Sequence, residues 1–279
     1  MNNGYIEPLG FILMRAASAT VLFWIFHCLF ISEKVKRKDF PLLMLCGLLG
    51  VAINQMFFFS GLKLTQPINA ALIMMTSPIV VIIVAPFITG ERITSRKLLG
   101  IAIGSIGSVF LITYGKTIQF DKSGLLGDLM ILVNAVSYSL YLVIVKKLML
   151  KYHPITVVKW VFTFGLIVII PFGLQQVTAV DWSSFDINIW LAFFYVLLFT
   201  TFFAYLLNAV ALKTVNSSVV AMYIYLQPLI ATVVALAMSK DELSTAKVVA
   251  GLFIYLGVYL VSSQPEKKRL ENDVTKTHS

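Results

Sequence analysis

The chain has 279 residues, of which 59% are hydrophobic and only 13% are charged. Soluble domains are about half apolar and about one quarter charged, so this composition excludes a water-soluble globular protein. The net charge of +9 does not indicate a nucleic-acid-binding protein, because the lysines and arginines lie mainly in short loops and in the C-terminal tail, as the orientation signals of membrane proteins do.

Nine continuous apolar stretches follow one another along the chain. A helix needs about 20 apolar residues to cross the hydrocarbon core of a bilayer, and each stretch is close to that length. The hydrophobicity is continuous instead of alternating, which excludes the strands of a membrane β-barrel. The sequence therefore predicts an all-α fold, a polytopic transmembrane helical bundle, with spans at residues 9–32, 41–62, 68–89, 98–114, 126–145, 155–174, 190–212, 219–238 and 248–263.

Two parts of the chain resemble each other. A period this long, built from membrane-length units, indicates a duplicated half of a fold, and transporters with such repeats hold the solute where the halves meet. We assign the first repeat to residues 1–115, the second repeat to residues 126–263 and a disordered cytoplasmic tail to residues 264–279. A shift of 150 residues, with one inserted residue before the last two matches, superposes Leu62 on Leu212, Lys63 on Lys213, Ala71 on Ala221, Pro78 on Pro228, Glu91 on Glu242 and Gly100 on Gly251.

The basic residues predict the orientation in the membrane. Most lysines and arginines fall in alternate loops and in the tail, which the positive-inside rule places in the cytoplasm together with the C-terminus. Under this assignment the turn at residues 91–97 is cytoplasmic, whereas its counterpart at residues 240–247 is external. The two repeats are therefore expected to have inverted orientations.

The number of spans differs between the repeats. The second repeat contains five spans and the first only four. Residues 1–15 resemble residues 150–160, which follow the first helix of the second repeat. We therefore hypothesise that a helix preceding Met1 has been lost through a late start codon or a truncated gene model, and that the complete protein has ten helices.

The duplicated pattern is similar to a known transporter family. A proline within a span, a glutamate in the next turn and a glycine nine residues later, together with Pro8 and Arg15 near the start, resemble the EamA domain of the drug/metabolite transporter (DMT) superfamily. The resemblance covers nearly the whole chain as two copies. It implies a carrier of small metabolites, often an amino-acid exporter, with a central cavity between inverted halves that opens alternately to the two sides.

Polar side chains within the apolar stretches are the candidate substrate-binding residues. Such side chains usually face protein or water, because lipid leaves them without hydrogen-bond partners. They could bind the charged groups of a zwitterion or the polar edge of another small solute; the alternative is hydrogen bonding between helices. The candidates are Asn54, Gln55, Asn69, Thr76, Asn134, Tyr138, Asn208, Tyr223, Tyr225 and Gln227, of which Asn54 and Asn208 occupy similar places in the two repeats.

Arg15 is the most deeply placed charge in the sequence and is also a substrate-binding candidate. On insertion scales an arginine at the centre of a helix costs about 2.5–3.5 kcal/mol. One interpretation is that Arg15 binds a carboxylate-bearing solute. The alternative is that its side chain extends along the helix to reach the membrane interface.

Pro78 and Pro228 lie at matching places in the middle of two spans. A proline cannot donate a backbone hydrogen bond and clashes with the carbonyl four residues earlier. We predict a pair of kinks that act as hinges; the alternative is a pair of static kinks that help packing. In the following turns Glu91 and Glu242 are expected to cap helices. The small residues at 100, 104, 107 and 108 are expected to form a close helix contact, with a homodimer face as the second interpretation.

The sequence contains no constellation typical of an enzyme. All acidic residues lie in loops, at span ends or in the tail, three histidines are scattered, and no glycine-rich nucleotide loop follows a strand. We predict no enzymatic activity, no cofactor and no metal. The predicted function is secondary transport, the export of small metabolites such as amino acids across a bacterial cytoplasmic (inner) membrane. The alternatives are a non-transporting scaffold or sensor and a broad-specificity drug efflux carrier. The predicted partners are a small-molecule substrate and the lipid bilayer, without nucleic acid.

Overall fold

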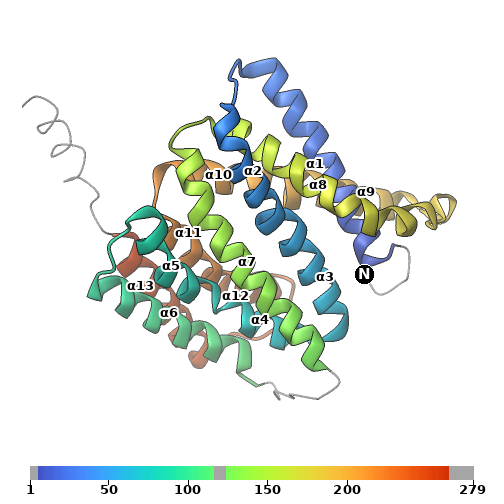
Figure 1. The fold of residues 1–279 in the computed structure, drawn as a ribbon. Coiled ribbons are helices and arrows are strands. Elements are labelled where there is room, and N and C mark those ends of the chain that lie inside the picture. The colour runs from blue at the N-terminus through green and yellow to red at the C-terminus, as the bar shows by residue number, and fades with distance from the viewer. Residues whose placement is uncertain (1–5, 116–123, 264–279) are drawn as a thin grey trace, which may run out of the picture.

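The computed structural model describes residues 6–115 and 124–263. Within these ranges every regular element is helical (Figure 1), and nine helical spans are long and apolar enough to cross a membrane. The predicted all-α transmembrane bundle is therefore confirmed, and the spans agree with the predicted ranges to within a few residues at each end. The predicted disordered tail lies outside the described residues.

Several spans are built from more than one helical segment, because the backbone leaves regular α-helical geometry inside them. The membrane helices and their internal segments are α1 (Pro8–Phe30), α2 (Phe40–Gly47), η2 (Leu48–Ile53), α3 (Asn54–Leu64), α4 (Pro67–Met74), α5 (Ser77–Thr89), α6 (Ser95–Thr113), α7 (Leu125–Met149), α8 (Pro154–Thr178), α9 (Ile187–Tyr195), η5 (Val196–Phe203), α10 (Ala204–Thr214), α11 (Ser217–Met222), η6 (Tyr223–Tyr225), α12 (Leu226–Ala237) and α13 (Thr245–Ser262), and the short turns η1 (Arg37–Asp39) and η4 (Trp182–Ser184) lie in connections.

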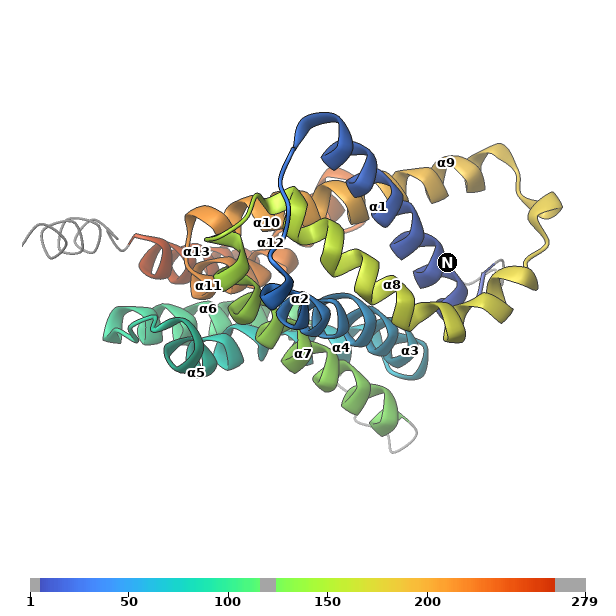
Figure 2. The same cartoon turned by 45° about the horizontal axis from the view of Figure 1, so that its top comes forward.

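The two repeats lie in two layers. Figure 2 shows α2–α6 in one layer and α9–α13 in the other. Three long helices run between the layers (Figure 2): α1 and α8 pack against each other, and α7 packs mainly against α3 and α5. α1 also packs against η5, and α8 also packs against α2. The largest apolar cluster contains residues from both layers and from these crossing helices, so the core lies between the repeats.

The two repeats also share an irregular backbone feature, a π-helical segment. The π-helical segments η2 and η5 occur at corresponding places, each directly before a helix that begins at residues related by 150, Asn54 in α3 and Ala204 in α10. π-helical turns are rare and often occur at functional sites, because they change the direction in which neighbouring side chains point. Their occurrence in both repeats shows that a local backbone feature is duplicated with the fold.

A single shift of 150 residues relates the two repeats, without the inserted residue that the sequence comparison required. Before α6, Lys97 binds the Glu91 carboxylate at 2.7 Å, and before α13, Lys247 binds the carboxylate of Asp241. Both lysines also donate to a backbone carbonyl one residue further along, at Arg92 and at residue 242. The counterpart of Glu91 is therefore Asp241, and the predicted match with Glu242 is wrong.

The glutamates also do not cap the following helices. Thr94 caps α6 by accepting a hydrogen bond from the Lys97 backbone N–H, and Ser244 caps α13 by accepting one from the Lys247 N–H. Hydroxyl side chains are favoured at this position, because their oxygen satisfies a backbone donor that the first helical turn leaves without a partner. The capping expected from Glu91 is replaced by its ion pair with Lys97, in which both side chains are buried.

Glycines allow α6 and α13 to pack with their backbones in direct contact. A Cβ atom added to Gly257 would lie 2.6 Å from the Gly100 carbonyl oxygen and 2.6 Å from the Gly104 nitrogen. A Cβ added to Gly107 would lie 2.9 Å from the Ala250 carbonyl oxygen. The small-residue face of α6 therefore forms the predicted close helix contact within the chain, and α13 occupies the face that the second interpretation assigned to a homodimer.

The sequence predicted that Pro78 and Pro228 lie in the interior of two α-helices. In the structure each proline instead lies near the start of a helix. α4 ends at Met74 and α5 begins at Ser77, so Pro78 belongs to the first turn of a new helix. In the second repeat the 3-10 segment η6 precedes α12, and Pro228 is the third residue of that helix. A first helical turn tolerates proline, because its N–H groups have no intrahelical partner. The spans are therefore interrupted before the prolines.

We expect the Gly257→Ala substitution to destabilise the protein by roughly 1–3 kcal/mol, because the added methyl group meets backbone atoms that cannot move aside. Thermal unfolding in detergent measures this effect. Gly251→Ala on the same helix is the matched control, since a Cβ there meets only the Leu229 Cδ1 atom, at 3.1 Å. Equal effects of the two substitutions would contradict the proposed backbone contact.

Candidate substrate site

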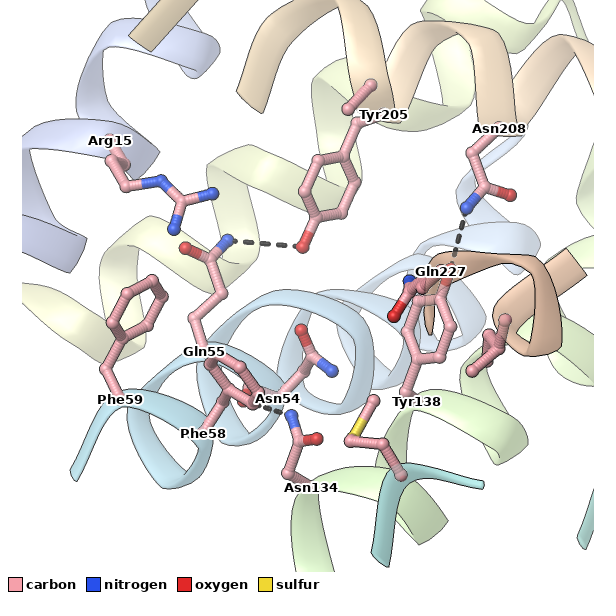
Figure 3. Close-up of a pocket in the computed structure, with 13 residues that line it drawn as sticks. Arg15, Asn54, Gln55, Phe58, Phe59, Asn134, Tyr138, Tyr205, Asn208 and Gln227 are labelled. Atoms are coloured by element: carbon pink, nitrogen blue, oxygen red, sulfur yellow. Dashed lines mark hydrogen bonds between the residues drawn. The ribbon is translucent and has the colours of Figure 1, made fainter. Parts of the chain in front are cut away.

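A cavity of about 280 Å³ lies between the two repeats (Figure 3). Its wall is mixed in character, because aromatic and aliphatic side chains alternate with amides, phenols and one guanidinium. The lining residues are Arg15, Asn54, Gln55, Phe58, Phe59, Met74, Asn134, Tyr138, Ala204, Tyr205, Asn208, Ile224 and Gln227.

The cavity lies on the pseudo-twofold axis that relates the repeats. Four pairs of lining residues are each separated by 150 positions, which means that equivalent positions of the two repeats face the same space. These pairs are Asn54 with Ala204, Gln55 with Tyr205, Phe58 with Asn208, and Met74 with Ile224. Asn54 and Asn208 are therefore not equivalent, contrary to the prediction, although both line the cavity.

Three of these four pairs differ in chemical character, whereas Met74 and Ile224 are both apolar. At the axis itself, the Gln55 Nε2 group donates to the Tyr205 hydroxyl at 3.4 Å, and that hydroxyl in turn donates to the Gly50 carbonyl at 3.5 Å. The backbone that encloses the cavity is thus nearly symmetric, whereas its lining is not. A solute with two different ends can therefore bind in one defined orientation.

Among the described residues that line the cavity, Arg15 from α1 is the only charged one, and its side chain is buried in the wall instead of extending to the interface. The Arg15 Nε group donates to the Thr201 hydroxyl at 2.8 Å. The centre of its guanidinium lies 5.7 Å from the Phe11 ring and 5.1 Å from the Phe59 ring. Aromatic rings attract a cation without neutralising it, so the positive charge persists at the cavity.

Three amide groups in the wall are held by their NH₂ ends. Gln55 donates to Tyr205, the Asn134 amide donates to the Asn54 carbonyl, and the Asn208 amide donates to the Tyr138 hydroxyl at 2.7 Å. The amide oxygens of Gln55, Asn134 and Asn208 are buried and accept no hydrogen bond from the described residues. Buried polar atoms normally have partners. The side chains of all three residues line the cavity, so these acceptors without partners lie in its wall.

The structure brings seven of the eleven predicted substrate-binding residues together. Three of the other four, Thr76, Tyr223 and Tyr225, lie at interruptions of the spans. Tyr225 is fully buried and its hydroxyl donates to the Met75 carbonyl at 3.1 Å, and the Thr76 hydroxyl donates to the Ile73 carbonyl. Asn69 is buried outside the cavity lining, and Tyr223 is 52% exposed on the outer surface. The seven that line the cavity are Arg15, Asn54, Gln55, Asn134, Tyr138, Asn208 and Gln227.

The sequence interpretation missed Tyr205 and the apolar part of the wall. Apolar lining residues such as Phe58, Met74 and Ile224 have the composition of lipid-facing residues, and no pattern in the sequence distinguishes the two. Tyr205 could have been found, because it lies 150 residues after the predicted Gln55. Thr201 carried no signal, since its importance comes only from its contact with Arg15.

The family of the chain follows from its match over both repeats. Residues 2–113 and 125–263 match the EamA-like transporter family. The chain belongs to this family. The two matched ranges include the whole cavity lining and all nine described spans. Membership in the EamA-like family, expected from the duplicated pattern, is thereby confirmed.

Relatives across most of the chain are named transporters. An uncharacterized transporter of Archaeoglobus fulgidus is 28% identical over 92% of this chain and 87% of its own length. The uncharacterized transporter YyaM of Bacillus subtilis is 27% identical over 93% of this chain and 86% of its own. A solved crystal structure has a TM-score of 0.78 at 19% identity, covering 93% of this chain and 90% of that one, which shows a shared fold. This EamA-family protein is therefore a membrane transporter.

We expect the Tyr225→Phe substitution to lower stability by about 1–3 kcal/mol, because the Met75 carbonyl would lose its side-chain donor in a buried place. The affinity for a transported solute should stay within about threefold of wild type, because Tyr225 does not line the cavity. Thermal unfolding and equilibrium solute binding measure the two quantities. A large loss of affinity at unchanged stability would restore the predicted binding role of Tyr225.

Proposed function

We propose that this transporter is a secondary carrier that exports small metabolites, amino acids or closely related compounds, across a bacterial cytoplasmic membrane. The observation that supports this proposal is the cavity on the pseudo-twofold axis, whose partly apolar wall contains a buried guanidinium and three amide side chains with oxygens that lack a partner among the described residues. A small amphipathic solute with charged or strongly polar groups matches such a wall. A volume of about 280 Å³ restricts the solute to the size of a single metabolite.

The proposed mechanism is alternating access between the two inverted repeats. Carriers with inverted repeats move one bundle against the other around a fixed central site. The interruptions of the spans, at Met75–Thr76 and at η6, lie beside cavity residues Met74 and Ile224. We therefore place the hinges of the movement at these interruptions, with Pro78 and Pro228 keeping the helices from closing across them.

Two further candidate functions are less well supported. A scaffold or sensor has no need for buried, free amide oxygens around a cavity, because such groups cost stability when nothing binds to them. A broad-specificity drug efflux carrier is more difficult to reconcile with Arg15, because the guanidinium repels the organic cations that many such carriers would have to accept. The positive charge in the wall therefore favours a metabolite carrier over a carrier of cationic drugs.

The test of the proposed function is counterflow in liposomes that contain the purified protein. Vesicles loaded with one unlabelled amino acid at a time should accumulate the same labelled amino acid for at least one member of a panel, and protein-free vesicles should not. A matching efflux assay in cells that express the gene determines the direction. Failure of every amino acid and related metabolite in the panel would contradict the proposed substrate class.

We expect Pro78→Ala and Pro228→Ala to slow counterflow by about tenfold, a free-energy change of about 1.4 kcal/mol in the conformational step, while solute affinity changes little. Alanine restores an N–H group, which allows the helix to extend through the interruption and stiffen the hinge. Pro86→Ala serves as the control, because Pro86 lies inside α5 and away from the cavity lining. Unchanged rates in both variants would refute the hinge.

A further inference from the structure

The nitrogen atoms of Arg15 are not equivalent in this structure. Its Nε–H group is bound by Thr201, and the rings of Phe11 and Phe59 lie close to the guanidinium. In the described part of the chain neither of the two terminal nitrogens donates a hydrogen bond to a protein acceptor, and no carboxylate pairs with the group. The free edge of the guanidinium is therefore its terminal pair of nitrogens, which Figure 3 shows directed toward Gln55 and the cavity.

The Thr201 hydroxyl can serve Arg15 only as an acceptor. It lies in the π-helical segment η5 and donates its single proton to the Val196 carbonyl, five residues earlier, at 3.1 Å. The oxygen then has its lone pairs available for the Arg15 Nε–H group, which it accepts at 2.8 Å. Thr201 itself is fully buried. This arrangement holds the plane of the guanidinium in one orientation before any solute binds.

We infer that Arg15 binds the carboxylate of the transported solute through its two terminal nitrogens and that Thr201 is the positioning residue for this contact. The inference rests on the proposed function and specifies which end of the solute decides affinity. A guanidinium binds a carboxylate with two parallel hydrogen bonds, either at the side that contains Nε or at the terminal edge. Because Thr201 occupies Nε, only the terminal edge remains.

The end of the cavity away from Arg15 has groups that match the part of such a solute away from its carboxylate. Figure 3 shows Arg15 at one end of the cavity and Asn208 at the other, with Gln55 and Tyr205 between them. The Asn134 and Asn208 side chains line the cavity, and their amide oxygens, which accept no hydrogen bond from the described residues, have the chemistry that suits an ammonium or another donor group. A carboxylate bound to Arg15 also supplies the negative charge that a buried arginine otherwise lacks.

The experiment measures equilibrium binding of amino acids to the purified protein, each compared with its own carboxamide. The carboxamide keeps the α-amino group and the side chain and replaces the carboxylate by an uncharged amide. The probes are L-leucine, L-methionine, L-threonine and L-phenylalanine with L-leucinamide, L-methioninamide, L-threoninamide and L-phenylalaninamide. We expect at least one acid to bind about 10- to 100-fold more tightly than its amide, as the loss of a charge-assisted bidentate pair predicts.

The variants separate the two roles. Arg15→Gln should bring the affinities of acid and amide to within about threefold of each other, and Arg15→Lys should retain part of the preference, because it keeps the charge but not the two-nitrogen edge. Thr201→Val should weaken binding of the acid about 3- to 10-fold and leave binding of the amide unchanged, since one hydrogen bond to the guanidinium is lost. Thr201→Ser keeps the hydroxyl and should restore wild-type affinity.

Thr200→Val is the matched control. Thr200 lies next to Thr201 and also donates to the Val196 carbonyl, at 2.9 Å, but it is exposed on the outer surface of η5. Equal affinity for acid and amide in the wild type, binding of no acid at all, or an Arg15→Gln variant that keeps the preference would overturn the inference. So would a Thr201→Val variant that weakens acid and amide equally, because that result indicates a purely structural role.

Binding and counterflow together distinguish a failure of this inference from a failure of the proposed function. The binding assay requires no translocation. If acids bind selectively but none is exchanged across the vesicle membrane, the carrier proposal fails and the role of Arg15 stands. If the amides are exchanged as well as the acids, the carrier proposal stands and the role of Arg15 is refuted.

Discussion

Hydrocarbon offers no hydrogen bonds to a polar group, and this constraint determines where the protein can depart from regular helices. Every backbone group at membrane depth must find a partner within the protein. The spans are interrupted at residues 75–76 and 223–225. At the interruption in the first repeat, the Met75 carbonyl accepts a hydrogen bond from the Tyr225 hydroxyl of the second repeat. These residues are themselves related by the 150-residue shift. At this interruption the second repeat therefore supplies a hydrogen-bond donor to a backbone carbonyl of the first.

The same constraint explains the character of the cavity. Hydroxyls and amides near the axis bind carbonyl groups of neighbouring helices, as Ser139 binds the Ser77 carbonyl and Asn134 binds the Asn54 carbonyl. Each such bond uses a side-chain donor, so the amide oxygens remain as unpaired acceptors at the cavity. Together with one guanidinium they make a wall that is incompletely satisfied when empty. The proposed solute, with donors at one end and an anion at the other, would supply the partners that this wall lacks.

Close packing at one end of the bundle keeps the repeats in register. The α6–α13 contact depends on glycines at 100, 107 and 257, and the two helices are equivalent under the 150-residue shift. Gly107 and Gly257 are themselves an equivalent pair, each facing backbone of the partner helix. The contact therefore lies across the pseudo-twofold axis, like the Gln55–Tyr205 hydrogen bond in the cavity. The contact therefore holds the two repeats together at this end.

The sequence by itself determined that the protein is an all-α transmembrane bundle, and it determined the number of spans in the described ranges, because a lipid bilayer requires long apolar helices. It also showed the duplication, because identical residues recur about 150 positions apart. It also selected most of the polar cavity residues, since a polar side chain within an apolar span needs a partner or water. Only the tertiary structure decided which of them meet. Tyr223 and Tyr225 lie two positions apart, yet one faces outward and the other is buried against Met75, and the apolar wall and Thr201 became recognisable only through their contacts. The physical reason is that helical periodicity distinguishes faces only where the helix is regular, and Tyr223 and Tyr225 lie in the 3-10 segment η6.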